Sequence, residues 1–183
     1  MKRKLLRLSV VPLCAVTLLF FATAHKGIAA TTHSACEVPQ GLRAAISSRF
    51  PGTSVVSLSD LTEYERRLFQ RDHGGRCPGS VRVDFYGDGQ PTWALALLDM
   101  ENSRRNVQLV LARELSKKWN LEVVDSVNEV AVLWVEKPGE YRDTYGEKTI
   151  RATHDAVVFC GYGSWAILYA WTGKDIQKVW ISD

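Results

Sequence analysis

Asp84 and Asp88 lie in the segment DFYGDGQPT at the spacing of a calcium-binding loop. Calcium takes about six to eight oxygen ligands, which such a loop supplies from alternating positions. The third and ninth positions here are Tyr86 and Thr92, so the segment offers only two carboxylates. Because the Gly-Asp-Gly tripeptide lets a chain reverse direction, we expect a turn between two strands, with Asp84 and Asp88 as the only candidate metal ligands.

Acidic and aromatic residues gather in a second segment, the connection 136–147 and the residues just before it. The candidate binding residues are Trp134, Glu140, Tyr141 and Tyr145. Side chains of these types suit a sugar, a cell-wall component or another protein. Glycoside hydrolysis, which requires paired carboxylates, is the alternative use of Glu136, Glu140 and Asp143. A solvated turn built on Pro138 and Gly139 has the same composition and is the alternative to any functional role. For a functional role, we expect a binding surface in preference to a catalytic one.

The other catalytic patterns in the chain are incomplete. Ser164 directly follows a glycine and precedes an apolar strand, unlike the nucleophile elbow of hydrolases. Cys160 and His154 would lie about 20 Å apart in a straight strand. His73 follows a helical pattern and is expected near a helix C-terminus, and the histidines are too scattered for zinc. We therefore predict no catalytic residue and no cofactor.

The first thirty residues have the three parts of a secretory signal peptide. A basic head, MKRKLLR, precedes the apolar run LSVVPLCAVTLLFFATA, and small residues follow. We expect cleavage near Ala24 or Ala30 and a periplasmic or secreted protein without a membrane segment. An uncleaved membrane anchor is the alternative, although the apolar run is near the lower limit for spanning a bilayer.

Removal of residues 1–30 reverses the sign of the net charge. Those residues contain five of the 23 basic side chains and no acidic one, which leaves 18 basic and 20 acidic residues and a net charge of −2. The basic character of the whole chain therefore belongs to the export signal. Nothing in the remaining composition favours a nucleic-acid partner.

Three cysteines remain after residue 30, and export permits a disulfide between two of them. Cys36 and Cys77 both stand in loop-like contexts, whereas Cys160 ends the apolar run AVVFC. We predict a disulfide between Cys36 and Cys77, with Cys160 as a small buried side chain.

Hydrophobic periodicity predicts a flexible lead over 31–37 and a single domain over 38–183. Helical patterns cover 38–50 and 61–73, the second opened by the Thr62–Glu65 capping box. Short strand patterns follow at 80–86, 92–99, 107–114, 119–126, 129–136, 155–162, 164–171 and 176–182. We expect an α+β fold, in which two N-terminal helices pack on a mainly antiparallel sheet of six to eight strands.

Alternation in the strand pattern 164–171 separates bulky from small side chains. Trp165, Ile167, Tyr169 and Trp171 point to one face, and small residues dominate the other. Core packing on both faces is the simpler interpretation. An exposed aromatic face that binds a partner is the alternative.

The loop Asp84–Thr92 resembles a single degenerate loop of the FG-GAP or VCBS-repeat type, in which an acidic loop joins propeller strands. More of the chain, including RFPGTSVVSLSDL, HGGRCPG and SWAILYAWTGKDIQKVWISD, resembles a group of small exported bacterial proteins of unknown function. The resemblance implies a bacterial exported single domain and assigns no activity to any residue.

These patterns together favour an exported, non-catalytic protein. We expect it to bind a macromolecular partner in the bacterial envelope, either another protein or a cell-wall component, through a sheet face or the 136–147 loop. An inhibitor or immunity-like protein is one form of this hypothesis. A weak envelope hydrolase that uses the acidic loop and a calcium-stabilised module are the alternatives.

Overall fold

The computed structural model describes residues 36–99 and 105–182, which belong to one compact unit. The expected signal peptide and nearly all of the expected lead lie outside the described residues. Among the described residues, no helix is long and apolar enough to cross a membrane.

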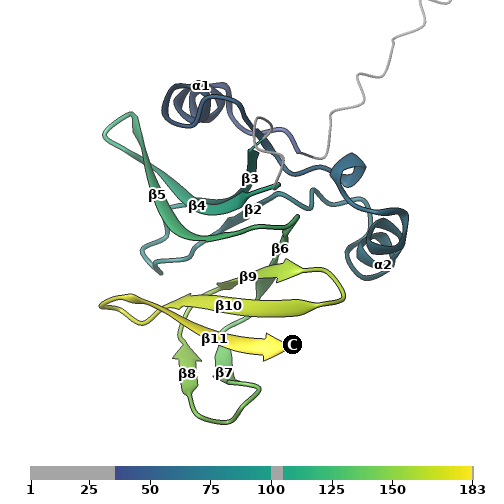
Figure 1. Ribbon diagram of the computed structural model, residues 1–183. Coiled ribbons are helices and arrows are strands. Elements are labelled where there is room, and N and C mark those ends of the chain that lie inside the picture. The colour runs from purple at the N-terminus through teal and green to yellow at the C-terminus, as the bar shows by residue number, and fades with distance from the viewer. Residues whose placement is uncertain (1–35, 100–104, 183) are drawn as a thin grey trace, which may run out of the picture. The chain divides into compact units, whose positions relative to one another are not determined.

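The predicted α+β class with one sheet is wrong. The described residues form eleven strands in three sheets and only two α-helices, so the fold is mainly β (Figure 1). Periodicity identifies strands one at a time, but long-range pairing decides how they divide into sheets. The sequence pattern also predicts a surface loop with one short strand inside it over 136–154, whereas this connection forms the two strands of a separate sheet.

The first sheet has five strands, all paired antiparallel. They are β1 (Thr53–Val55), β2 (Ser80–Val83), β3 (Thr92–Asp99), β4 (Val107–Leu115) and β5 (Lys118–Val127). Strand β3 pairs with β4 along one edge, while β1 and β2 share its other edge end to end. This arrangement places β2, β3, β4 and β5 side by side.

The second sheet has the strand order β11-β10-β9-β6. Its strands are β6 (Val132–Glu136), β9 (Ala156–Gly161), β10 (Trp165–Trp171) and β11 (Ile176–Ser182). The third sheet is the hairpin of β7 (Gly139–Arg142) and β8 (Thr149–Ala152). Its turn is attached to β11, because the backbone N–H of Thr144 donates to the carbonyl of Trp180 at 2.8 Å.

The two faces of the first sheet bury different hydrophobic clusters. Leu95 and Leu97 of β3 pack with Leu42 and Ile46 of helix α1 (Gln40–Arg49). The alternate β3 residues, such as Ala96, join the main core with the second sheet. Strand β3 is thus buried on both faces, which explains why its sequence is a nearly continuous apolar run.

Helix α2 (Glu63–His73) begins and ends where local signals place it. Thr62 and Glu65 form the expected capping box, in which the Thr62 backbone N–H donates to Glu65 Oε2 at 2.7 Å. Gly74, with φ at 67°, ends the helix in a conformation that glycine adopts without strain. Asp72 and His73 therefore lie in the last turn of α2, just before the residue that ends the helix. A short 3-10 helix, Leu58–Asp60, precedes α2.

The predicted disulfide is confirmed. Cys36 and Cys77 are bonded across a sequence separation of 41 residues, and Cys160 is free and buried. The bond joins the segment before α1 to the segment between α2 and β2. A disulfide of this kind is consistent with an oxidising, non-cytoplasmic compartment.

The bulky side chains of β10 take part in packing between elements. The Tyr169 hydroxyl donates to Asp125 Oδ2 of β5 at 2.5 Å, and the Trp165 indole N–H donates to Glu129 at 2.5 Å. The ring of Trp171 lies 5.2 Å from that of Tyr86. Core packing, and not an exposed aromatic face, therefore describes this side of β10.

Candidate functional site

One central cavity shares lining residues with each of two neighbouring cavities. The central cavity, of about 330 Å³, lies between the end of α2, β2 and β6. It shares Arg82 and Trp93 with the sheet-face cavity, of about 490 Å³. It shares His73 and Trp134 with the helix-end cavity, of about 540 Å³. The volumes fall within the range of about 300–1,000 Å³ that is usual for ligand sites.

The sheet-face cavity takes one lining side chain from each of four neighbouring strands. These are Arg82 from β2, Trp93 from β3, Glu114 from β4 and Trp119 from β5. Arg82 lies directly opposite Trp93 in the β2–β3 register, and Glu114 lies opposite Trp119 in the β4–β5 register. The cavity therefore rests on the face of a paired sheet.

Turn and helix residues complete the sheet-face cavity. Lys117 comes from the β4–β5 turn, where its φ is 63°, and Pro39 is the N-cap residue of α1. A Cβ atom at Gly41 would lie 3.0 Å from Nε1 of Trp119, so this glycine lets the first turn of α1 approach the indole. The position of Trp119 thus depends on a small residue in α1.

The central and sheet-face cavities carry a net positive charge. Arg76, Arg82 and Lys117 line them, against the two acidic side chains Glu37 and Glu114, which gives +1. Within residues 36–99 and 105–182, the three cationic side chains make no hydrogen bond or ion pair. They are therefore available to an anionic ligand.

His73 and Trp134 form the wall between the central and helix-end cavities. Their rings stack with centroids 5.1 Å apart and an interplanar angle of 27°, and Phe69 lies 4.8 Å from His73. Burial lowers the pKa of His73, although Asp72 opposes this shift, so the neutral imidazole is favoured at pH 7. The Trp134 indole donates to Glu136 Oε1 at 2.9 Å, which fixes the ring.

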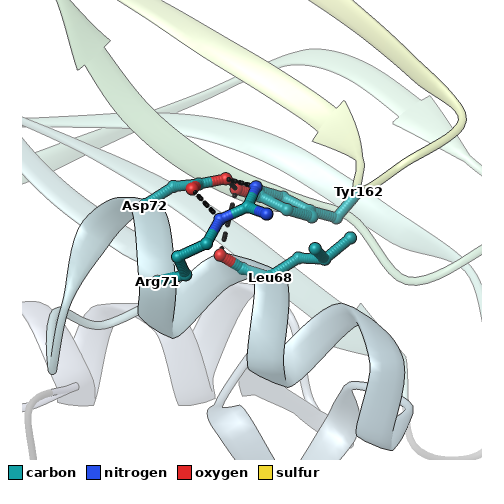
Figure 2. Close-up of polar contacts among 4 residues, drawn as sticks. All are labelled: Leu68, Arg71, Asp72 and Tyr162. Atoms are coloured by element: carbon teal, nitrogen blue, oxygen red, sulfur yellow. Dashed lines mark hydrogen bonds and ion pairs between the residues drawn. The ribbon is translucent and has the colours of Figure 1, made fainter.

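Arg71 and Asp72 line the helix-end cavity, and Figure 2 shows the polar contacts of this charged pair. Arg71 binds Asp72 through two hydrogen bonds of 2.6 and 3.0 Å, and the Tyr162 hydroxyl donates to Asp72 at 2.5 Å. The same hydroxyl lies 3.5 Å from the carbonyl oxygen of Leu68. The Arg71 bonds, and then that of Tyr162, lower the pKa of Asp72 to about 2. Asp72 is therefore an anion at neutral pH and has no proton to donate to a substrate.

The nucleophile candidates lack activation. Cys160 and Ser164 both line the helix-end cavity. Burial raises the pKa of the Cys160 thiol to about 12, so the reactive thiolate is absent at pH 7. His154 packs against Gly87 in the β2–β3 loop, where a Cβ atom would come within 2.1 Å of its ring.

The two aspartates of the β2–β3 loop bind groups of the protein itself. Both oxygens of Asp84 accept from the Gly89 backbone N–H at 3.2 Å. Asp88 accepts from the Gln90 backbone N–H at 3.0 Å and forms an ion pair with Arg113. No group of three or more His, Cys, Asp or Glu residues that could hold a metal ion occurs in the described part of the chain.

The structure separates the four predicted binding residues. Trp134 lies in the cavity wall, whereas Glu140, Tyr141 and Tyr145 lie on the β7–β8 hairpin and line none of the three cavities. In the hairpin, Asp143 accepts from the backbone N–H groups of Tyr145 and Trp180. The Asp143 carboxylate thus helps to hold the hairpin against β11.

Sequence reasoning missed most of the cavity residues. These are Arg76, Arg82, Trp93, Glu114, Lys117 and Trp119. The usable signal was the alternation of β3, which turns Trp93 away from the main core together with Leu95 and Leu97. The neighbours of Trp93 on β2 and β5 depend on strand register, which no local pattern supplies.

No protein-family model, no curated protein and no solved structure matches this chain. The resemblances of the Asp84–Thr92 loop and of the wider chain therefore stay predictions. The function must be inferred from the chain's own geometry.

Proposed function

We propose that the chain is exported and acts as a non-catalytic protein that binds a macromolecular partner in the bacterial envelope. The observation that carries this proposal is that the central cavity shares Arg82 and Trp93 with the sheet-face cavity, and His73 and Trp134 with the helix-end cavity. An extended ligand could occupy adjoining cavities at once, whereas a small isolated molecule would fill only one. An inhibitor or immunity-like protein is one form that such a binding protein could take.

The chemistry of the lining supports recognition of a partner. Trp93, Trp119 and Trp134 offer large rigid rings, and Arg76 and Arg82 offer unpaired guanidinium groups. Tryptophan and arginine are the residue types that most often dominate binding energy at interfaces. The combination gives apolar contact area beside charged anchors.

Location in the envelope is supported by the chain's start and by its disulfide. The basic and apolar segments within residues 1–30 have the form of a signal peptide, and Cys36–Cys77 needs an oxidising environment to persist. We infer release into the periplasm or the medium after cleavage.

Binding is favoured over hydrolysis by the state of the titratable groups. Glu136 accepts from Trp134, and Asp143 accepts from two backbone N–H groups, so both carboxylates already bind groups of the protein itself. Asp72 is held ionised and Cys160 is held as a thiol. Asp72 therefore lacks the proton of a general acid, and Cys160 lacks the thiolate of a nucleophile.

Sedimentation with envelope material tests the proposal. The full chain is expressed with its own leader in a bacterium, purified in oxidised form, and mixed with purified peptidoglycan sacculi or with outer-membrane fragments. We expect binding that falls about tenfold in Arg82→Ala, since a lost anchor of about 1.4 kcal/mol has that effect. Arg151→Ala is the matched control, because Arg151 is also exposed on a strand but lines none of the cavities.

Two outcomes would reject the proposal. One is release of soluble fragments from the sacculi that stops in Glu140→Gln or Ser164→Ala, which would make the chain a hydrolase. The other is equal binding by the Arg82 and Arg151 variants, or no binding to either material. Peptide sequencing of the purified N-terminus tests export separately, and an intact Met1 would contradict cleavage.

A further inference from the structure

We infer that the sheet-face cavity is a subsite for a saccharide that carries carboxylate groups. This inference rests on the proposed function and names the ligand class for part of the same site. It follows from the two tryptophan rings, the unpaired cations and the position of the cavity on the face of four paired strands.

Trp93 and Trp119 are half-buried rings, and the Nε1 edge of Trp119 lies against Gly41 of α1. Two other tryptophans, Trp134 and Trp165, donate their indole N–H groups to Glu136 and Glu129. Among the described residues, Trp93 and Trp119 donate no such hydrogen bond. A sugar ring has an apolar C–H face and a rim of hydroxyl groups, so it can pack on an indole and accept from its N–H at the same time.

Charge in the cavity selects an acidic sugar over a neutral one. Arg82 and Lys117 are exposed and unpaired, and Glu114 is the single acidic residue of the lining. The residues beyond position 30 carry a net charge of −2, so these cations stand out against an acidic chain. A carboxylate matches the planar guanidinium of Arg82, while the Glu114 carboxylate accepts from sugar hydroxyls.

The sheet face disfavours a peptide strand and a nucleic acid. A peptide that adds to a sheet pairs along a strand edge, whereas the sheet-face cavity is lined by side chains on the face of four paired strands. A nucleic acid needs a continuous track of cations for its phosphates. Here Glu37 and Glu114 interrupt the basic residues. Side-chain recognition of rings and carboxylates fits this surface better.

The adjoining central cavity extends the subsite. It shares Arg82 and Trp93 and adds Arg76 beside an apolar lining that includes Phe69 and Leu133. A sugar on the two indoles could therefore place an acidic substituent or a neighbouring ring near Arg76. An oligosaccharide, or a sugar with an acidic side group, uses both cavities.

Titration calorimetry with three soluble probes tests the inference. The probes are a disaccharide muropeptide from peptidoglycan, a trigalacturonate and the neutral chitotriose. We expect the full chain, purified after export, to bind at least one acidic probe about tenfold or more tightly than chitotriose. Binding of the muropeptide alone would assign a cell-wall source, and binding of trigalacturonate would assign a uronate polymer.

Substitutions then place the carboxylate in the cavity. We expect Lys117→Gln and Arg82→Gln each to lower the affinity for the acidic probe about fivefold to tenfold. The affinity for chitotriose should stay unchanged in both variants. Lys174→Gln, in the exposed β10–β11 turn outside the three cavities, should change neither. Trp119→Leu should lower the affinity for both saccharides. Circular dichroism of each variant should show the native fold.

The inference is overturned if chitotriose binds as tightly as the acidic probes, or if Lys117→Gln and Lys174→Gln behave alike. It is also overturned if the stem peptide without its sugar binds as well as the muropeptide. In these cases, sedimentation with envelope material that still depends on Arg82 would leave the proposed function standing. If neither the preference for acidic saccharides nor the Arg82-dependent sedimentation is observed, both this inference and the proposed function are rejected.

Discussion

Arg82 and Trp93 lie directly opposite each other across the β2–β3 pair, and both line two adjoining cavities. The pair therefore connects the central cavity to the sheet-face cavity. A cationic group and an aromatic ring on neighbouring strands give one surface that can hold both charged and apolar parts of a ligand. The predictions below test the elements that hold this surface in place.

The disulfide stabilises the segments that frame the central cavity. It closes a loop of 41 residues, and the chain-entropy model gives about 4 kcal/mol for a loop of that length. The Cys36→Ser/Cys77→Ser double variant should lose about 2–5 kcal/mol of unfolding free energy in urea titrations. Cys160→Ala gives the control for loss of a thiol outside the bond. Equal stability of the reduced and oxidised wild type would contradict the prediction.

Gly79 lets β2 pass close to the backbone of Val56. A Cβ atom at Gly79 would meet the carbonyl oxygen of Val56 at 2.2 Å and its nitrogen at 2.6 Å, and backbone atoms cannot move aside. Gly79→Ala should therefore destabilise the protein by about 3 kcal/mol or more. At Gly75 a Cβ atom meets nothing within 4 Å, so Gly75→Ala should change stability by less than about 1 kcal/mol. Thermal unfolding that gives the same midpoint for both variants would refute this account.

Tyr169 joins β10 to β5 through Asp125. Burial would raise the pKa of Asp125, but hydrogen bonds from Lys178 and Tyr169 lower it overall. Tyr169→Phe should lower the free energy of unfolding by about 1.5–3 kcal/mol, the usual range for a hydrogen bond to a charged group. It should also raise the pKa of Asp125, because the carboxylate loses a donor. Tyr64→Phe is the control, since Tyr64 is 60% exposed. Denaturant titration measures the first effect, and carboxyl NMR measures the second.

The Asp72 cluster predicts a loss of stability in acid. The folded pKa of Asp72 is about 2, whereas an unfolded aspartate titrates near about 3.9. The folded state thus binds fewer protons, so the contribution is complete above about pH 4 and is lost as the pH falls to about 2. Tyr162→Phe removes one donor and should raise the pKa of Asp72 towards the unfolded value.

Carboxyl NMR titration of wild type and Tyr162→Phe measures this pKa directly. Asp72→Asn removes the titrating group and should flatten the corresponding part of the stability profile. If the pKa of Asp72 is the same with and without the Tyr162 hydroxyl, the hydrogen bond contributes nothing to the shift.

Local signals in the sequence were enough for the helices and the disulfide. The Thr62–Glu65 capping box depends on residues three positions apart, and helix α1 follows from the spacing of Leu42 and Ile46. The cysteine pairing followed from context, since only Cys160 stood in an apolar strand. Each of these features is determined within a short segment or by elimination among few residues.

The division into sheets and the cavities could not be predicted in this way. The β7–β8 hairpin is fixed partly by the bond from Thr144 to Trp180, which lie 36 residues apart in sequence. The pairing of Arg82 with Trp93 depends on register across the β2–β3 loop. Trp134 could be singled out from the composition of its segment alone. Its stacking partner His73 comes from α2, and no local pattern indicates that contact.

Radical footprinting of the tryptophans with and without a saturating soluble envelope polymer tests the proposed binding surface most directly. Mass spectrometry measures the oxidation of each indole. We expect the ligand to reduce oxidation of Trp93 and Trp119 several-fold, while Trp180, which is 37% exposed and lines none of the three cavities, is oxidised as before. Protection of Trp180 with no change at Trp93 and Trp119 would contradict the account.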